Sequence, residues 1–446
     1  MNTDLLKHYG GAVPRYTSYP TAPHFHDGVT ADDYRRWLTA LPKSEALSLY
    51  FHVPFCARMC WYCGCHTKIV NRYQPVADYA SLLIREIDLL ADALGTKRAV
   101  SHIHWGGGTP TILSADDFKR LMDRISARFS LNEDSEIAIE IDPRTVDQDK
   151  IIALADAGIN RTSLGIQDFN PDIQHAINRV QSFEQTKAVV DGIRRAGIQS
   201  ISFDLMYGLP NQGTEDVQRT VDLSHELRPD RLSIFGYAHV PWMKSHQKMI
   251  NEEDLPDSPN RMQQAIAVAD RLNKLGYRRI GLDHFASPDD SMALALDDGS
   301  LQRNFQGYTT DTASTLLGLG PSAIGSLSQG YVQNTAAMHH YADAINAGEF
   351  PIVKGVELSA EDRMRRTIIE RLMCDHRIDL GDVVTAQDPG FQHEKTILSA
   401  MQKDGIVSVI DNCIQVTEAG RPFVRSICAV FDTYLDSGRG RHSKAI

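Results

Sequence analysis

The chain has 446 residues, of which 42% are hydrophobic and 23% are charged, an ordinary composition for a globular protein. Its formal net charge of −11 argues against non-specific nucleic-acid binding, which requires a basic surface. No run of about 18 apolar residues exists and the N-terminus lacks a basic and apolar leader pattern, so we expect neither a membrane span nor a signal peptide. Four of the seven cysteines are clustered and the rest are scattered, which indicates no disulfide framework and predicts a cytoplasmic protein.

The first 45 residues predict an irregular N-terminal extension, because Pro14 and Pro20 interrupt any regular pattern. From residue 47 onward, strand-like apolar runs alternate with amphipathic helical patterns, as in parallel β/α units. The six predicted strands cover residues 47–53, 100–105, 136–141, 161–166, 200–205 and 231–235. This pattern predicts an α/β fold with a partial, TIM-like (β/α)6 barrel over about 47–250, within a catalytic domain of residues 46–355.

Beyond residue 250 the alternation changes. A helical pattern near 260–275 leads to a strand-like run near 278–283, and a glycine-rich stretch follows over 299–330. Residues 356–446 predict a separate, mostly helical domain, in which 404–417 has the pattern of a hairpin of the winged-helix kind. Because the chain is acidic, we interpret this domain as a structural lid or docking unit rather than as a DNA-binding unit.

The strongest chemical signal is the cluster of Cys56, Cys60, Cys63 and Cys65. Three thiolates at the spacing C-x₃-C-x₂-C can hold three irons of a [4Fe–4S] cluster and leave the fourth iron open to a small molecule, whereas electron-transfer clusters normally have four cysteine ligands. The main alternative is a structural zinc site that uses Cys56, Cys60, Cys63 and either Cys65 or His66. Zinc sites usually have a second, distant ligand pair, and the sequence contains no second C-x-x-C.

Residues of chemical interest lie at or just after the end of each predicted strand. They are Cys56, the glycines 106–108 with Thr109, Glu140, Gln167, Asp204 and Ala238, in the order of the strands. In (β/α) barrels the functional residues gather at the carboxyl ends of the strands, so we expect these residues to share one site. Taken singly, each has an ordinary interpretation: the glycines as a tight turn, Arg179 and Asp204 as surface charges, and His102 and His104 as core histidines.

These motifs resemble the radical S-adenosylmethionine (SAM) superfamily, and within it the family of oxygen-independent coproporphyrinogen III oxidases, also called coproporphyrinogen dehydrogenases. The resemblance runs nearly end to end. It includes Pro-Arg-Tyr-Thr-Ser-Tyr-Pro-Thr at 14–21, His-Val-Pro-Phe-Cys at 52–56, Trp-Gly-Gly-Gly-Thr-Pro-Thr at 105–111, the blocks at 165–169 and 204–210, and Arg-Asn-Phe-Gln-Gly-Tyr-Thr-Thr at 303–310. The cysteine motif specifies only the superfamily, whereas the blocks at 14–21 and 303–310 point to the porphyrinogen enzymes.

The resemblance implies a role for each matching position. Cys56, Cys60 and Cys63 would ligate the [4Fe–4S] cluster, and Cys65 would be required for activity without ligating iron. One SAM would contact Tyr62, Gly108, Thr109, Gln167, Arg179, Asp204 and Ala238. A second SAM would lie beside Tyr50, Gly107, Glu140 and Ile324, with Phe305 and Gln306 close by; Tyr50, Glu140, Phe305 and Gln306 are also expected to be catalytic.

The implied reaction is the anaerobic oxidative decarboxylation of two propionates of coproporphyrinogen III to vinyl groups, which gives protoporphyrinogen IX through a 5′-deoxyadenosyl radical. It needs a one-electron reductant such as flavodoxin and an electron acceptor, and we expect a monomer. For the substrate carboxylates we expect Arg15 and Arg303 as partners, with structural salt bridges as the alternative. The competing functions are a non-catalytic haem-binding or haem-delivering relative and a zinc-stabilised interaction protein.

Overall fold

The computed structural model describes residues 3–384 and 390–435, so residues 385–389 and 436–446 of the predicted C-terminal domain lie outside the described part. A twelve-stranded sheet forms its centre, in the order β16-β15-β14-β13-β1-β4-β5-β6-β7-β8-β10-β9. The strands from β13 to β8 in this order run parallel. They are β13 (Thr315–Leu319), β1 (Leu47–Val53), β4 (Ala99–Gly107), β5 (Ser130–Ile141), β6 (Arg161–Gln167), β7 (Ser200–Tyr207) and β8 (Arg231–Gly236).

All six predicted strands are confirmed, as β1 and β4 to β8, in the predicted order. The sequence analysis missed β13, which comes from the glycine-rich stretch and adds a further parallel strand beside β1. The sheet stays open. On one side it continues through antiparallel strands β14 (Ile324–Ser326), β15 (Gly330–Asn334) and β16 (Ile352–Glu357), and on the other through β10 (His284–Ala286) and β9 (Arg278–Ile280). The fold is therefore a partial barrel.

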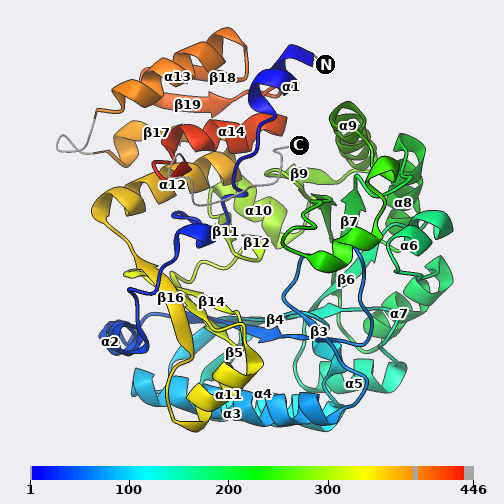
Figure 1. Cartoon of the computed structure of the whole chain (residues 1–446), viewed down its shortest axis with the longest axis vertical. Coiled ribbons are helices and arrows are strands. Elements are labelled where there is room, and N and C mark those ends of the chain that lie inside the picture. Colours follow the sequence, from blue (N-terminus) through cyan, green and yellow to red (C-terminus); the bar gives the residue numbers. More distant parts are fainter. Residues whose placement is uncertain (1–2, 385–389, 436–446) are drawn as a thin grey trace.

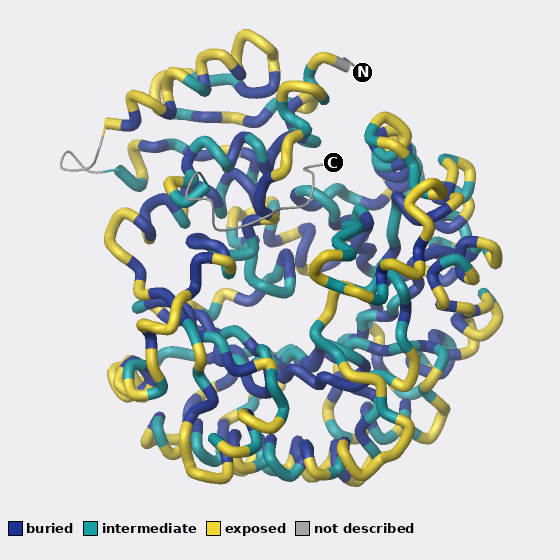
Figure 2. Tube along the Cα trace, in the orientation of Figure 1, coloured by how far each residue is buried: buried dark blue, intermediate teal, exposed yellow. Residues whose placement is uncertain are grey.

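Helices cover the outer face of the parallel sheet (Figure 1). They are α3 (Gln74–Leu94), α4 (Ala115–Arg128), α5 (Gln148–Asp156), α6 (Pro171–Ala176), α7 (Phe183–Arg195) and α8 (Thr214–Glu226). Side chains of a strand alternate between two faces. On the helix side Phe51 stacks on Trp105, with ring centroids 4.2 Å apart, while Tyr50 and His52 point to the other face. Figure 2 shows the strands buried along most of their length and the helices exposed on their outer sides.

The N-terminal extension is less irregular than predicted. It contains α1 (Thr3–Tyr9) and α2 (Ala31–Ala40). Helix α2 forms because Thr30 and Asp33 make a reciprocal capping box, and because Tyr34, Trp37 and Leu38 give the helix a buried face. The stretch between the two helices is irregular apart from one short 3₁₀ turn.

The C-terminal unit is mostly helical, as expected. It consists of α12 (Ala360–Asp375), β17 (Arg377–Asp379), α13 (Gln392–Lys403), β18 (Val407–Ile410), β19 (Cys413–Val416) and α14 (Val424–Cys428). Strands β18 and β19 form the predicted antiparallel hairpin. Helix α1 packs against this unit (Figure 1), and the Tyr9 hydroxyl donates to Asp404 across 2.6 Å. The N-terminal segment and the C-terminal unit therefore form one cap.

The remaining elements connect these parts. They are β2 (Phe55–Cys56), β3 (Lys68–Ile69), α9 (Ser258–Lys274), α10 (Ser291–Asp298), β11 (Gln302–Asn304), β12 (Gly307–Thr309) and α11 (Met338–Asn346). Helix α9 and strand β9 match the patterns predicted near 260–275 and 278–283. Within residues 3–384 and 390–435, no helix combines the length and the hydrophobicity needed to cross a membrane.

A buried carboxylate joins α3 to the part of the sheet that the sequence analysis missed. Glu86 on α3 accepts hydrogen bonds from the Tyr341 hydroxyl (2.6 Å), the Gly320 N–H (2.7 Å) and the Asn334 amide (2.9 Å). Burial raises its pKa to about 7, although the three donors oppose that shift. All three donors are buried away from water and need an acceptor inside the protein. The position of β13 to β15 therefore depends on the Glu86 side chain.

We predict that Glu86→Ala destabilises the fold by about 3 kcal/mol, because it leaves several buried donors without an acceptor. The matched control is Asp92→Ala on the same helix, since Asp92 is exposed and makes only a surface pair with Arg128, which is worth at most about 1 kcal/mol. Urea unfolding followed by circular dichroism measures both. Equal midpoints for the two variants would contradict the role given to Glu86.

Candidate active site

The four clustered cysteines lie in the loop after β1, at the carboxyl end of the parallel sheet. Cys56 ends β2, which pairs with β3 and so brackets the loop at its base. All four cysteines line one cavity of about 480 Å³. The structure thus brings together the residues that the spacing suggested.

Hydrogen-bond donors surround two of the sulfurs. The hydroxyls of Thr67 and Thr109 donate to Cys56 Sγ across 3.2 and 3.3 Å. The guanidinium of Arg144 lies 3.2 Å from Cys60 Sγ. Burial raises the pKa of the Cys56 thiol, and the two hydroxyls oppose this shift. Such donors stabilise a thiolate, which is the form that binds metal.

The guanidinium of Arg179, in the loop after α6, also approaches the Cys60 sulfur. Its Nη1 lies 3.6 Å from Cys60 Sγ and its Nη2 donates to the Gly165 carbonyl across 2.6 Å. Asp142 accepts from Arg144 at 2.7 Å and lies 3.5 Å from Arg179, so one carboxylate orients both cations. The Nε of Arg179 is buried and has no partner in the protein. Arg179 lines the cavity, and a cation with an unpartnered donor at this position fits an anionic ligand.

Most of the predicted site residues line this one cavity. They are Arg15, Cys56, Cys60, Tyr62, Cys63, Cys65, Gly107, Gly108, Thr109, Glu140, Gln167, Arg179, Asp204 and Ala238. Arg15 comes from the N-terminal segment and Arg179 from the loop after α6. The others come from the carboxyl ends of six successive strands, which is why residues so distant in the sequence meet.

The glycine run allows the backbone to approach the cavity. Gly107 has φ +107°, a conformation that other residues rarely adopt. A Cβ on Gly108 would lie 2.5 Å from the Phe55 carbonyl oxygen. Gln167, at the end of β6, also has a positive φ of 69°, and local backbone strain of this kind gathers at functional sites. These positions therefore present backbone groups as well as side chains to a ligand.

Two carboxylates lie on the inner wall. Glu140 accepts from the Gly107 N–H at 3.2 Å and pairs with His104 at 3.2 Å. Asp204 accepts from the Ser163 hydroxyl across 3.0 Å. Burial and the charge of Glu140 together raise the pKa of Asp204 to about 6, so Asp204 remains mostly ionised at neutral pH and can accept hydrogen bonds.

The residues expected around the second SAM lie deeper. Tyr50 stacks with His104, with ring centroids 5.9 Å apart, and so stands next to the Glu140 pair. Phe305 and Ile324 pack in one apolar cluster. Gln306 lines an inner cavity of about 210 Å³, which shares Glu140 and Asp204 with the cysteine cavity. The structure groups these residues nearby, but Tyr50, Phe305, Gln306 and Ile324 do not line the cysteine cavity itself.

Arg303 also lies outside the cysteine cavity. It donates to the carbonyls of Arg15 and Tyr16, each across 3.2 Å, and its guanidinium lies 4.3 Å from the ring centre of Tyr308. These contacts tie the N-terminal segment to β11 and β12. The carboxylate-binding role expected for Arg303 remains a prediction.

The loop after β8 supplies contacts that the sequence analysis missed. Lys244 Nζ donates to the Cys65 carbonyl (2.9 Å), His246 to the Cys63 carbonyl (2.7 Å) and Gln247 to the Tyr62 carbonyl (2.9 Å). Asp142 and Arg144 were missed as well, although they come directly after the predicted strand at 136–141. No spacing in the sequence identifies the Lys244 loop, because its partners lie about 180 residues away.

The donor set fits an iron–sulfur cluster with one open iron. In the described part of the chain, no three His, Cys, Asp or Glu side chains are grouped as tightly as a single metal ion requires. The fit therefore rests on three thiols in one cavity, on hydroxyl and guanidinium donors aimed at their sulfurs, and on the unpartnered Nε of Arg179. Cys56, Cys60 and Cys63 would hold the cluster, and the opposite wall would hold an anionic ligand of the open iron.

Comparisons with known proteins agree with this arrangement. Residues 50–224 match the family model described as Radical SAM superfamily, and residues 358–423 match the HemN C-terminal domain. The chain is 50% identical to the oxygen-independent coproporphyrinogen III oxidase of Bradyrhizobium diazoefficiens, over 100% of both chains. It is 44% identical to the protein of that name from Paracoccus denitrificans, over 98% of this chain and 97% of the other.

A solved structure is similar over nearly the whole length. It is the coproporphyrinogen III oxidase HemN of Escherichia coli, described as a radical SAM enzyme, with a TM-score of 0.91 and 38% identity. The match covers 97% of this chain and 99% of that one. The likeness therefore extends to the N-terminal segment and the C-terminal unit as well as the barrel.

We predict that Arg144→Met weakens retention of the cluster roughly 10-fold, because Cys60 loses a cation and Asp142 loses its main partner. Arg144→Lys, which keeps the charge, should lose less. Iron and sulfide bound per chain, measured after anaerobic reconstitution against a competing chelator, test this without any activity assay. Equal retention in Arg144→Met and the unsubstituted protein would refute it.

Proposed function

This chain belongs to the family of oxygen-independent coproporphyrinogen III oxidases in the radical SAM superfamily, and we infer that it performs the reaction of that family. It converts two propionates of coproporphyrinogen III to vinyl groups and yields protoporphyrinogen IX. Each propionate loses one β-hydrogen atom, CO₂ and one electron. The observation that carries this conclusion is the single cavity shared by the cysteines, the glycine run and Arg179. The non-catalytic haem-binding alternative is not favoured, because the likeness covers the whole chain.

The [4Fe–4S] cluster and SAM, when bound, supply the 5′-deoxyadenosyl radical that removes the propionate hydrogen. The chain supplies position and closure. Cys56, Cys60 and Cys63 hold the cluster, and Arg144 and Arg179 keep the Cys60 sulfur in a positive environment. The loop that carries Lys244 covers the backbone of the cysteine loop and limits access of water.

We propose roles for the residues of the SAM wall. Arg179 pairs with the SAM carboxylate through its unpartnered Nε, which no protein group satisfies. Asp204 accepts from the ribose hydroxyls, and the Tyr62 ring packs on the adenine. Gly108 and Thr109 present backbone groups, and Gln167 and Ala238 complete the wall.

The second SAM is a finer proposal. We place it between Gly107 and the inner cavity, where Glu140 stands next to Tyr50 through the His104 ring. Ile324, Phe305 and Gln306 would then border it from the β11–β14 side. This arrangement would put the expected catalytic residues within reach of the propionate that reacts.

We further propose that residues 1–45 and 356–446 close the catalytic domain of 46–355. Arg15 of the N-terminal segment lines the cysteine cavity and donates to the Gly236 carbonyl across 3.1 Å, which supports a closing role. One chain supplies every wall of this cavity, so we propose that the monomer is the active unit. Its seven cysteines are all free, in keeping with the reducing cytoplasm.

The electron partners are proposed by class. A one-electron reductant such as flavodoxin would reduce the cluster, and a separate acceptor would take the electron left on the substrate. Trp242 and Met243 are exposed, in the loop whose Lys244 contacts Cys65, and they offer a docking surface on the cluster side.

The test of function is an anaerobic assay of reconstituted protein with dithionite, SAM and coproporphyrinogen III. We expect 5′-deoxyadenosine and vinyl-bearing porphyrin products together. Deoxyadenosine without vinyl product would indicate a radical SAM enzyme with another substrate. Absence of both products, from protein that holds its cluster, would favour the haem-binding alternative.

We predict that Cys65→Ser keeps cluster absorbance but abolishes decarboxylation, because Cys65 lines the cavity and the family resemblance assigns it no iron. Cys413→Ser is the matched control, since Cys413 lies in β19, outside the cysteine cavity, and its sulfur accepts a hydrogen bond from Arg377 Nε. Visible absorbance and product formation are measured on the same samples. Loss of the cluster in Cys65→Ser would instead make Cys65 a ligand.

A further inference from the structure

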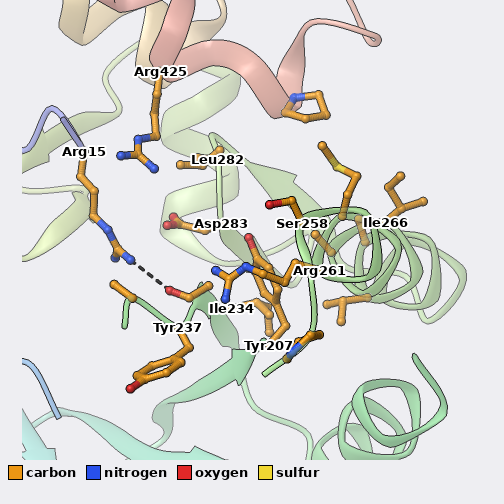
Figure 3. A pocket seen from close by; sticks show the side chains of 18 of the residues that line it. Arg15, Tyr207, Ile234, Tyr237, Ser258, Arg261, Ile266, Leu282, Asp283 and Arg425 are labelled. Atoms are coloured by element: carbon orange, nitrogen blue, oxygen red, sulfur yellow. Dashed lines mark hydrogen bonds between the residues drawn. The ribbon is translucent and has the colours of Figure 1, made fainter. Parts of the chain in front are cut away.

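A second, larger cavity adjoins the cysteine cavity. Its volume is about 880 Å³, within the range of roughly 300–1,000 Å³ that ligand pockets have. Arg15, Gly236, Tyr237 and Ala238 line both cavities, so the two spaces meet at the end of β8. The larger cavity is enclosed by the edge of the barrel, helix α9, the N-terminal segment and the C-terminal unit (Figure 3).

Three arginines from three different parts of the chain converge in this cavity. Figure 3 shows Arg15, Arg261 and Arg425 pointing toward one another around Asp283. Arg15 comes from the N-terminal segment, Arg261 from α9 and Arg425 from α14. Tyr237 and aliphatic side chains such as Ile234 and Leu282 form the walls between them.

Backbone carbonyls and an aromatic ring contact these arginines. Arg425 Nε donates to the Pro14 carbonyl across 2.9 Å, and its Nη2 donates to the Val13 carbonyl. The Arg261 guanidinium lies over the Tyr207 ring, 5.7 Å from its centre. The Arg15 side chain donates to the Gly236 carbonyl across 3.1 Å. Backbone carbonyls and a ring thus help to position these cations.

The charges inside the cavity repel one another. Burial and the charge of Arg15 lower the pKa of Arg425 to about 10, and the same two effects lower that of Arg261 against the opposing pull of Tyr207. Asp283 is the carboxylate that faces them. Burial would raise its pKa, but the hydrogen bond from His284 and the charges of His284, Arg303 and Arg15 lower it to about 2. An added anion would relieve this repulsion.

The other carboxylates of the lining lie at the rim. Asp257, Asp270 and Glu418 are exposed to solvent, Asp257 caps α9, and Glu418 pairs with Arg421 at 2.9 Å. Water screens exposed charges much more than buried ones. The interior of the cavity is therefore more positive than a count of its lining residues suggests.

We propose that this cavity holds the tetrapyrrole, and that Arg15 and Arg261 bind the carboxylates of those propionates that are not reacting, with Arg425 adding positive charge beside them. The inference rests on the proposed function. The substrate has four carboxylates on an apolar macrocycle, and the cavity pairs apolar walls with converging guanidinium groups, which bind carboxylates in a forked geometry. The shared wall at Gly236 to Ala238 lets the remaining propionate reach the SAM side.

This assignment gives the cap a chemical task. The N-terminal segment and the C-terminal unit each contribute one arginine, and Arg425 also anchors the backbone beside Arg15 through Val13 and Pro14. The barrel alone supplies the radical chemistry. Substrate recognition requires the assembled cap.

Arg261→Met tests the proposal, because methionine keeps an apolar side chain and removes only the charge and its donors. We expect KM for coproporphyrinogen III, and Kd for the stable oxidised porphyrin coproporphyrin III, to rise about tenfold or more. KM for SAM and the iron content should stay unchanged. Arg271→Met is the matched control on the same helix, since Arg271 faces Asp222 and lies outside the cavity.

An unchanged KM and Kd in Arg261→Met would overturn the proposal, and so would an equal rise in KM for SAM, which would indicate a general structural defect. Arg15→Ala is the second variant, because Arg15 is exposed and its loss should not prevent folding; it should raise the same KM and Kd. If the unsubstituted chain fails to convert coproporphyrinogen III, the proposed function fails, yet the coproporphyrin titration still decides the cavity. Weaker binding by the variants supports it, and equal binding refutes it.

Discussion

The parallel arrangement of β1 and β4 to β8 is the constraint on which the rest of the structure depends. Because neighbouring strands run in the same direction, their carboxyl ends meet at one edge, and loops far apart in sequence share a cavity there. The aromatic stack of Phe51 on Trp105 fixes the two strands that carry the cysteine loop and the glycine run. Moving either strand would separate the cysteines from the wall that faces them.

The cysteine loop has little regular structure of its own and is held by side chains from elsewhere. Lys244, His246 and Gln247 bind its carbonyls, while Arg144 and Arg179 approach the Cys60 sulfur. Cations near the sulfur favour the thiolate, and bonds to the carbonyls fix the loop before any cofactor binds. The same contacts thus serve both shape and chemistry.

The net negative charge of the chain is compatible with the positive interior of its larger cavity, because the negative and positive charges lie in different parts of the molecule. Most acidic residues are on the surface, where water screens them, whereas Arg261 and Arg425 are buried or half-buried, beside a tyrosine ring and backbone carbonyls respectively. Net charge therefore describes the solvated exterior and says little about an enclosed site. The site's preference for anions depends on where a few arginines lie.

Local pattern was enough to identify the six strands, the helices between them and the cysteine motif, because alternation, helical periodicity and ligand spacing all act over a few residues. The resemblance extended this to the residues of the cavity wall, and the cavity indeed contains most of them. It did not reveal β13, helix α2, or the contacts of Arg144 and Lys244. Strand β13 looks like a glycine-rich loop in the sequence. Helix α2 depends on the Thr30 cap and on a buried face, and it lies in a segment that its prolines made look irregular throughout.

The sequence by itself determined the chemistry. It places three thiols at a fixed spacing in a loop after a strand, and this spacing is a local property of the chain. Only the tertiary structure decided the geometry of recognition. Arg15, Arg261 and Arg425 are separated by more than a hundred residues in each case; the block at 14–21 pointed to Arg15, but no local motif singled out Arg261 or Arg425. They meet because the N-terminal segment, α9 and α14 pack around one cavity, and long-range packing of that kind leaves no local trace in the sequence.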